Sequence, residues 1–166
     1  MIHRTIAPAA VVWALASLVP LPFAQGQPLT PAGSPEPNDA KSAEEVLSGA
    51  NIPALDPHTM TRNEIEEVLG AGPLCTYHYT TAGNPILAFN EAPAEGAPAG
   101  VVKLDGELIA LSPMQVGEGF GLASGSVRLL VVPEELPEAG EQEEAVLRFE
   151  VGDQLTVGYL GYFGCN

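Results

Sequence analysis

The chain has 166 residues, of which 21 are acidic and six are basic, and its formal net charge at pH 7 is −15. Phosphate binding needs clustered lysine and arginine, so this composition argues against nucleic acid as a partner. A charged partner would instead be a basic protein, attracted over long range. Solubility of an exported protein is the favoured explanation of this acidity, ahead of a charged partner.

The N-terminus has the three-part pattern of a secretory signal peptide. A basic start precedes an apolar run from Ile6 to Phe23, and Ala24 fits a cleavage position. Three prolines interrupt the run, which argues against a membrane-spanning helix. We therefore expect residues 1–24 to be a cleaved signal peptide, with an uncleaved anchor as the alternative. The mature protein is then periplasmic or secreted, with no stable membrane insertion.

The only two cysteines, Cys75 and Cys165, lie at opposite ends of the apparent folded part. An oxidising compartment favours a disulfide, and two cysteines permit only one internal bond. A redox or metal role would need a closer pair or further ligands. We predict a Cys75–Cys165 disulfide with Cα atoms roughly 4.4–6.8 Å apart.

Residues 25–56 are rich in proline, alanine, serine and glutamate. Such a segment buries too little apolar surface to offset its ordering entropy. We predict a disordered tether here, with at most a transient helical turn near Ser42–Ala50. The folded β-domain is expected to span residues 57–166.

The stretch after residue 60 predicts one short helix from Arg62 to Leu69. Thr61 and Glu64 have the spacing of a capping box, and Gly70 stands where a helix stops. An isolated helix of about eight residues is unstable, so its apolar stripe must pack against the rest of the domain, and one end of a barrel is a place where it would fit as a plug. That stripe consists of Ile65, Val68 and Leu69.

Everything after the helix alternates in the manner of β-strands joined by short turns. About eight runs qualify, with Asp105-Gly106 as the strongest hairpin signal. We predict a mainly β fold, a small antiparallel barrel or sandwich of about eight strands with one short N-terminal helix. Cys75 begins the first strand and Cys165 ends the last, so a disulfide between them would fasten a closed sheet.

Catalytic and metal constellations are missing from the sequence. His58 falls near the tether and His78 in mid-strand, neither with a positioned partner. The glutamates between residues 134 and 144 lack the ligand spacing of a calcium loop and resemble a solvated charge run. We therefore expect no enzyme activity, no catalytic residues, no cofactor and no metal.

Aromatic residues gather near the predicted seam of the barrel. They could form core, line a small ligand-binding mouth, or present a surface to a partner. The residues of this possible binding surface, together with one Ser-Gly turn, are Tyr77, Tyr79, Ser124, Gly125, Tyr159 and Tyr162.

Two resemblances follow from these segments. CTYHYT, NPILAF, VVKLDGELIAL and VGYLGYFGC resemble members of an uncharacterised family of small exported proteins of Gram-negative bacteria. The overall pattern also resembles the MliC-like periplasmic inhibitors of c-type lysozyme, which are eight-stranded barrels with cysteines near both ends. Ser124-Gly125 matches the Ser-Gly pair of their inhibitory loop, but Val127 and Arg128 follow in place of the tyrosine, and no Thr-Lys-Gly segment occurs.

The leading hypothesis is a non-enzymatic exported β-domain, a binding or envelope-associated accessory protein. The alternative implied by charge and by the second resemblance is an inhibitor of a basic cell-wall hydrolase such as c-type lysozyme.

Overall fold

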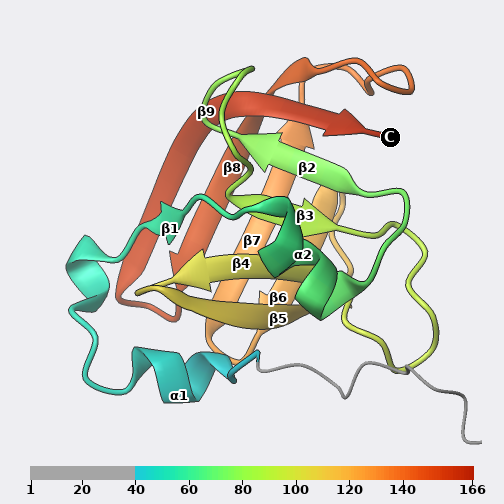
Figure 1. Cartoon of the computed structure of the whole chain (residues 1–166). Helices are drawn as coiled ribbons and strands as arrows, with labels where there is room; N and C mark the ends of the chain where they lie inside the picture. Colours follow the sequence, from blue (N-terminus) through green and yellow to red (C-terminus); the bar gives the residue numbers. More distant parts are fainter. Residues whose placement is uncertain (1–39) are drawn as a thin grey trace, which may run out of the picture. The chain divides into compact units, whose positions relative to one another are not determined.

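The structure, a computed structural model, describes residues 40–166 (Figure 1). The predicted signal peptide and residues 25–39 of the predicted tether lie outside this range. No helix within the described range is long and apolar enough to cross a membrane. In chain order the elements are α1 (Ala43–Leu47), a 3-10 turn η1 (Ile52–Ala54), β1 (Pro57–His58), α2 (Arg62–Leu69), β2 (Cys75–His78), β3 (Leu87–Phe89), β4 (Gly100–Leu104), β5 (Glu107–Met114), β6 (Phe120–Ser124), β7 (Val127–Pro133), β8 (Glu143–Val151) and β9 (Leu155–Cys165).

Strands β2 to β9 form a closed antiparallel barrel, which confirms the predicted fold class. They follow the order β4-β3-β2-β9-β8-β7-β6-β5, and a β4–β5 pairing closes the ring. The extra strand β1 pairs with β4 at Lys103 and Leu104, just beyond the residues of β4 that pair with β3. The predicted β4–β5 hairpin turns at Asp105-Gly106, where both residues have positive φ (49° and 83°) as a tight turn of this kind requires.

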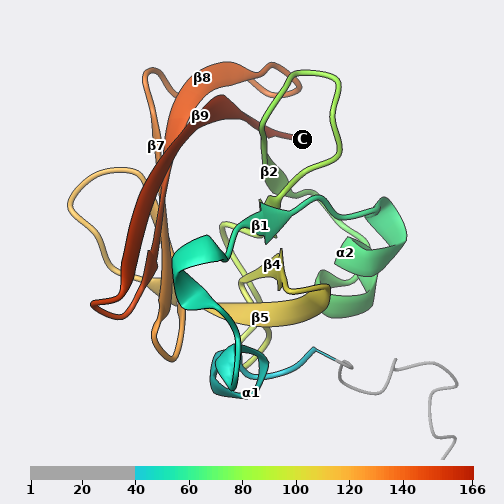
Figure 2. The same ribbon diagram turned by 90° about the vertical axis from the view of Figure 1, so that its left-hand side faces the viewer.

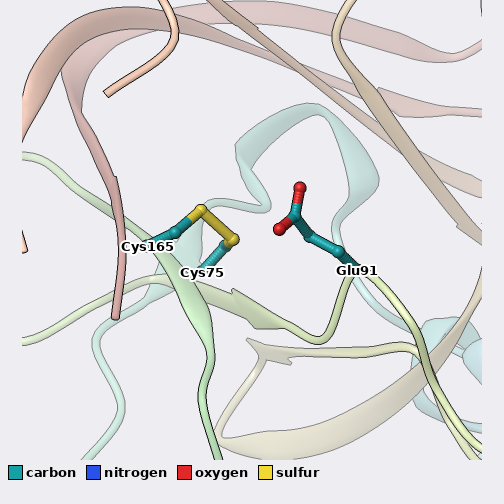
Figure 3. A group of neighbouring side chains, drawn as sticks. All are labelled: Cys75, Glu91 and Cys165. Carbon is teal, nitrogen blue, oxygen red and sulfur yellow. A yellow bond between two sulfur atoms is a disulfide. The ribbon is translucent and has the colours of Figure 1, made fainter. Parts of the chain in front are cut away.

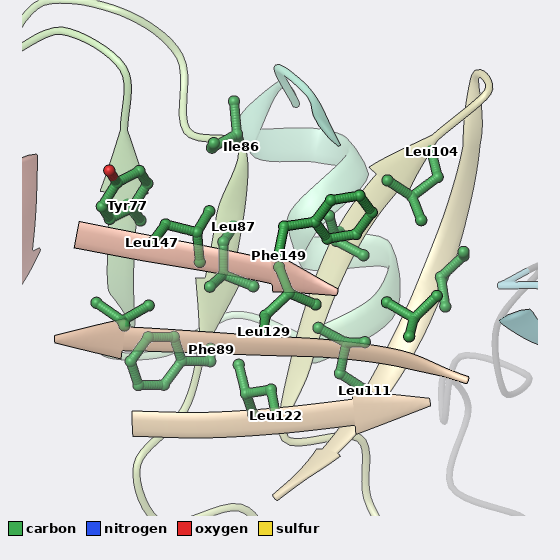
Figure 4. Packing of buried hydrophobic residues seen from close by; sticks show 14 of the residues in the cluster. Tyr77, Ile86, Leu87, Phe89, Leu104, Leu111, Leu122, Leu129, Leu147 and Phe149 are labelled. Carbon is green, nitrogen blue, oxygen red and sulfur yellow. The ribbon is translucent and has the colours of Figure 1, made fainter. Parts of the chain in front are cut away.

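The barrel interior is filled with side chains (Figure 4). Along β8, for example, buried residues alternate with partly or fully exposed ones, as the period of a strand facing a core on one side demands. Barrels of this size usually fill with their own side chains rather than leave a channel. The largest fully buried ones from the strands include Tyr77, Leu87, Phe89, Leu104, Ile109, Leu111, Leu129, Leu147, Phe149 and Phe163.

Each end of the barrel has its own cover. At one end Phe120 contacts Phe89 and Phe163, with ring centroids 5.3 and 5.1 Å apart. At the other end α1 lies beside the β6–β7 turn, below β5 in the view of Figure 1. Ala43 and Val46 of α1 are buried in the same cluster as the barrel core.

The prediction of a disordered tether was therefore wrong for residues 40–56. Ser42 caps α1 by accepting a hydrogen bond from the Glu45 backbone N–H, and the Lys41 N–H donates to the Leu108 carbonyl oxygen. Val46 and Leu55 belong to the core cluster. Few apolar residues suffice in this segment because the barrel end supplies the other half of the contact.

Helix α2 is confirmed from Arg62 to Leu69, including the capping box between Thr61 and Glu64. It does not plug a barrel end, as considered above, but lies outside the barrel over β4 (Figure 2). Its Ile65 and Val68 are buried against Ala88 and Val101, which belong to β3 and β4. The apolar stripe thus has a docking surface on the outer side of two strands.

The predicted disulfide is confirmed between Cys75 and Cys165. The two residues are direct partners in the β2–β9 pairing, so the bond joins the first and last strands of the barrel. Their Cα atoms are 4.0 Å apart, slightly below the predicted range. The Asn166 N–H donates to the Leu74 carbonyl oxygen just outside the pair, which marks it as a non-hydrogen-bonded pair, the closer type in an antiparallel ladder.

Candidate functional site

His78 is held by two hydrogen bonds within the chain. Its Nδ1 lies 2.7 Å from the Gly83 carbonyl oxygen, and its Nε2 lies 2.9 Å from the Thr76 hydroxyl. A carbonyl oxygen only accepts, so Nδ1 carries a proton, and in the neutral imidazole the Thr76 hydroxyl then donates to Nε2. Both ring nitrogens are then occupied, and neither is free to act on a substrate in this state.

Within the described residues, one group has the proximity that metal ligation needs: Cys75, Glu91 and Cys165 (Figure 3). Metals bind cysteine as the thiolate, and here both sulfur atoms are joined in the disulfide. This cluster therefore offers one exposed carboxylate, that of Glu91, and no metal-binding set.

Tyr77 is buried, so its predicted place in a binding surface was wrong. Its hydroxyl donates to the carbonyl oxygens of Tyr159, at 2.8 Å, and Ala145, at 3.3 Å. Burial raises the pKa of Tyr77 to about 12. The hydroxyl reaches this position because Gly161 has no side chain, since a Cβ there would lie 2.7 Å from the hydroxyl oxygen.

Tyr79 and Tyr159 meet edge to face, with ring centroids 5.5 Å apart. Tyr159 donates to a carboxylate oxygen of Asp56 at 2.5 Å, and Tyr79 donates to the Pro57 carbonyl oxygen at 3.1 Å. Burial raises the pKa of Tyr79 to about 12, and burial together with the Asp56 bond raises the pKa of Tyr159. The two rings thus tie residues 56 and 57 to the barrel.

Ser124 and Gly125 lie in the β6–β7 turn at the α1 end of the barrel. The carboxylate of Glu44 in α1 lies directly against Gly125, in the space that a Cβ would occupy. The structure therefore places this Ser-Gly turn beside α1. It does not bring the turn together with the tyrosines.

Tyr162 belongs to an apolar area on the outside of the barrel, which we call the β8–β9 outer face. Val146 of β8 pairs with Leu160 of β9 on one side and with Val132 of β7 on the other. Leu160 is 81% exposed and Val146 is 41% exposed. The β8–β9 outer face is defined by Val132, Val146, Leu160 and Tyr162.

A hollow of about 230 Å³ lies on the β8–β9 outer face. Val146, Leu160 and Tyr162 line it together with Tyr79 and two acidic residues, Glu134 and Glu144. Residue-by-residue reasoning missed Leu160 and Val146, although a signal was present. Strict alternation along β9 places Leu160 on the opposite side from Tyr159 and Phe163, and therefore outside a barrel whose core holds Phe163.

Glu134 and Glu144, which line the hollow, form no ion pair within the described residues. Four of the six basic residues are used in ion pairs elsewhere: Lys41 with Glu107, Arg62 with Glu66, Lys103 with Glu64 and Arg148 with Glu150. No ion pair within residues 40–166 involves the β7–β8 glutamates at positions 134, 135, 138, 141, 143 and 144. The β8–β9 outer face therefore combines exposed apolar side chains with carboxylates that no lysine or arginine of residues 40–166 neutralises.

Together, fold and surface define a small, disulfide-closed antiparallel β-barrel with a filled interior. The chain belongs to the family described as a domain of unknown function (DUF6692), whose model matches residues 27–166. No curated protein and no solved structure shows significant similarity to it.

Proposed function

We propose that this protein is a non-enzymatic, exported binding domain whose partner is a basic protein, met in the periplasm, at the envelope surface or outside the cell. The observation that carries the proposal is the β8–β9 outer face, where Leu160 and Val146 are exposed beside Glu134 and Glu144. Aliphatic residues gathered on the outside of a filled barrel contribute little to its core, and they fit a partner surface.

Several further features support the proposal. The interior is occupied by side chains, so small-molecule binding inside the barrel finds little room. Both ring nitrogens of His78 are hydrogen-bonded, which weakens its case as a general base. The disulfide and the signal-like N-terminus fit an oxidising compartment outside the cytoplasm.

The test compares proteins retained from a periplasmic or culture extract by wild type and by Val146→Ser/Leu160→Ser. Wild type should retain a basic protein at low ionic strength and release it as salt rises, because exposed charge attraction is screened. The double variant should lose it. Leu136→Ser serves as the matched control, since Leu136 is 76% exposed in the β7–β8 loop, apart from the β8–β9 outer face. Equal retention by the double variant would reject this face as the binding surface.

Inhibition of a basic cell-wall hydrolase such as c-type lysozyme is the second candidate function. It is favoured by the closed eight-stranded barrel, its terminal disulfide and its acidity. Glu44 lies against Gly125, however, so the turn that resembles an inhibitory loop is partly covered. Lysis of a bacterial suspension by c-type lysozyme, measured with an excess of the mature protein, decides the matter: undiminished lysis rules the inhibitor out.

A further inference from the structure

Strand β9 is much longer than its neighbour β2, and half of one edge is therefore open. β9 pairs with β8 along Leu155–Phe163, but with β2 only along Tyr162–Cys165. Figure 1 shows β9 continuing well past the end of β2. Residues 156–160 have a partner strand on one side and, within the described part of the chain, none on the other.

The hydrogen bonds of β9 identify the backbone groups that face this open edge. Backbone groups of alternate residues in an antiparallel strand point to opposite edges. The Asn166 N–H bonds to Leu74 on the β2 side, whereas the Cys165 carbonyl oxygen accepts from Gly140 on the other side. The backbone N–H and C=O groups of the even-numbered residues of β9 therefore point toward the β2 edge. Beyond the end of β2, Thr156, Gly158 and Leu160 direct their N–H and C=O groups to the open edge.

These backbone groups have no hydrogen-bond partner on the open side within residues 40–166. No backbone or side-chain hydrogen bond on the open side uses Thr156, Gly158 or Leu160. All three residues are exposed, and a Cβ added at Gly158 would meet nothing within 4 Å. Proteins usually blunt such edges with lysine, proline or a bulge, because an unpaired row of donors and acceptors is a template for another strand. Residues 156–160 contain none of these devices.

The surroundings of the edge determine which strand it would accept. Asp56 accepts a hydrogen bond from Tyr159, whose side chain lies on the inner side of β9. Glu144 pairs with Tyr162, two residues beyond Leu160. The nearest basic side chain, Arg148, faces Gly158 but is paired with Glu150. The local charge is negative, so an incoming strand should carry basic residues.

Two other occupants fit less well. A second copy of this chain would bring two molecules of net charge −15 together at their acidic edges. The chain's own residues 25–39 contain prolines at positions 28, 31, 35 and 37, and proline cannot donate to a ladder.

We propose that an extended, basic segment of a partner protein adds as a strand to the edge of β9 at Thr156–Leu160. Main-chain hydrogen bonds to Thr156, Gly158 and Leu160 would supply affinity, as in other cases of strand addition. Apolar side chains of the segment would lie over Leu160 and Val146 on the outer face, and the alternate lysines or arginines would lie on the opposite side, beside Asp56. This inference rests on the proposed function and names its binding mode.

The test uses a capped heptapeptide of alternating lysine and valine as the probe. Binding is measured by fluorescence anisotropy, and amide hydrogen exchange is followed by NMR. The probe should bind wild type and slow exchange at Thr156, Gly158 and Leu160, whose amides are unprotected in the free protein. A peptide of alternating glutamate and valine should not bind. Neither should the lysine–valine peptide when it is N-methylated at alternate residues, because it cannot complete the ladder.

A matched pair of variants separates the backbone from the side chain. Gly158→Pro removes one N–H at the open edge and places the proline ring there, without removing a bond to β8. Gly158→Ala keeps the N–H. The probe should bind Gly158→Ala like wild type and Gly158→Pro about tenfold or more weakly. Circular dichroism and thermal melting of both variants test whether the barrel is intact. If the proline variant does not fold, the N-methylated peptide tests the same backbone hydrogen bonds on the unaltered protein.

The outcomes are distinct. Absence of probe binding, binding without protection of the three amides, or equal binding to folded Gly158→Pro would each overturn strand addition. A concentration-dependent dimer that protects the same amides without the probe would mean that a second copy occupies the edge, and would overturn the basic occupant. If a basic protein is retained through Leu160 and Val146 yet tolerates Gly158→Pro, the proposed function stands and the strand-addition mode fails.

Discussion

Two areas on the outside of the barrel carry apolar side chains, and only one of them is covered. Over β3 and β4, Ala88 and Val101 are fully buried beneath α2. On the β8–β9 outer face, Val146 and Leu160 remain exposed. Packing against α2 thus explains the apolar residues outside β3 and β4. No element of the described structure covers those of the β8–β9 outer face in the same way. The contrast is the basis of our proposal that a partner packs against the β8–β9 outer face.

Loss of the disulfide should have the largest effect, because both faces depend on barrel closure. The bond spans a sequence separation of 90, and the chain-entropy model gives about 4.6 kcal/mol for a loop of this size. We expect Cys75→Ser/Cys165→Ser to lower the free energy of unfolding by about that amount in urea titrations, while the far-ultraviolet β signal persists. A loss below about 1 kcal/mol would mean that the strand pairing alone holds the closure.

Placing a charge on each face tests the comparison directly. Ile65→Asp puts an unpaired carboxylate beneath α2 and should cost about 3 kcal/mol. Leu160→Asp puts the same group on the exposed face and should change stability by less than about 0.5 kcal/mol. Thermal and urea unfolding of the two variants give both values. Equal costs would show that the β8–β9 outer face is packed within the protein after all.

Two glycines of β9 extend the comparison to a single strand. A Cβ at Gly161 would meet the His78 carbonyl oxygen and the Tyr77 hydroxyl, whereas a Cβ at Gly158 would meet nothing. Gly161→Ala should therefore cost about 2 kcal/mol through overpacking, and Gly158→Ala should be neutral or slightly stabilising. Urea unfolding of the two variants measures the difference. A neutral Gly161→Ala would mean that β2 can move away from β9, and that the open edge is longer than residues 156–160.

The parts of the fold with strong local signals could be predicted from the sequence. Helix α2 has its capping box and its terminal glycine, and the β4–β5 hairpin has Asp105-Gly106, so each is specified within a few residues. The disulfide followed from the count of cysteines and the strand order. These features need no knowledge of distant contacts.

Features that depend on distant contacts could not be predicted. α1 has a serine cap and only a few apolar residues, and it is ordered because the far end of the barrel buries Ala43 and Val46. Tyr77 and Tyr79 look equivalent in sequence, yet one is buried beneath the β8–β9 pair and the other contacts Pro57. The open edge of β9 follows from the difference in length between β9 and β2, which is a property of the sheet and of no single residue.

The smallest predicted effect concerns the ion pair that holds α2 over its face. A hydrogen bond from Lys103, and then one from the Thr61 backbone N–H, lowers the pKa of Glu64 from 4.5 to about 2. Because the folded-state pKa is the lower one, the unfolded chain takes up the proton first as pH falls. The charge of Glu64 therefore stabilises the fold above about pH 4.5, and this contribution is lost as pH falls toward 2.

Glu64→Gln isolates this charge, since glutamine can still complete the capping box. The pair is partly exposed, so we expect a loss of only about 0.5 kcal/mol at pH 7. The loss should shrink below pH 4.5, until the two proteins are equally stable below about pH 2. Glu67→Gln, on the exposed side of α2, is the control and should track wild type throughout. Urea unfolding across this pH range gives the comparison. The stability difference between Glu64→Gln and wild type could instead stay constant with pH. That result would show that the Lys103 contact does not hold α2 on the barrel. Apolar burial of Ile65 and Val68 would then be the only difference between the covered face and the open one.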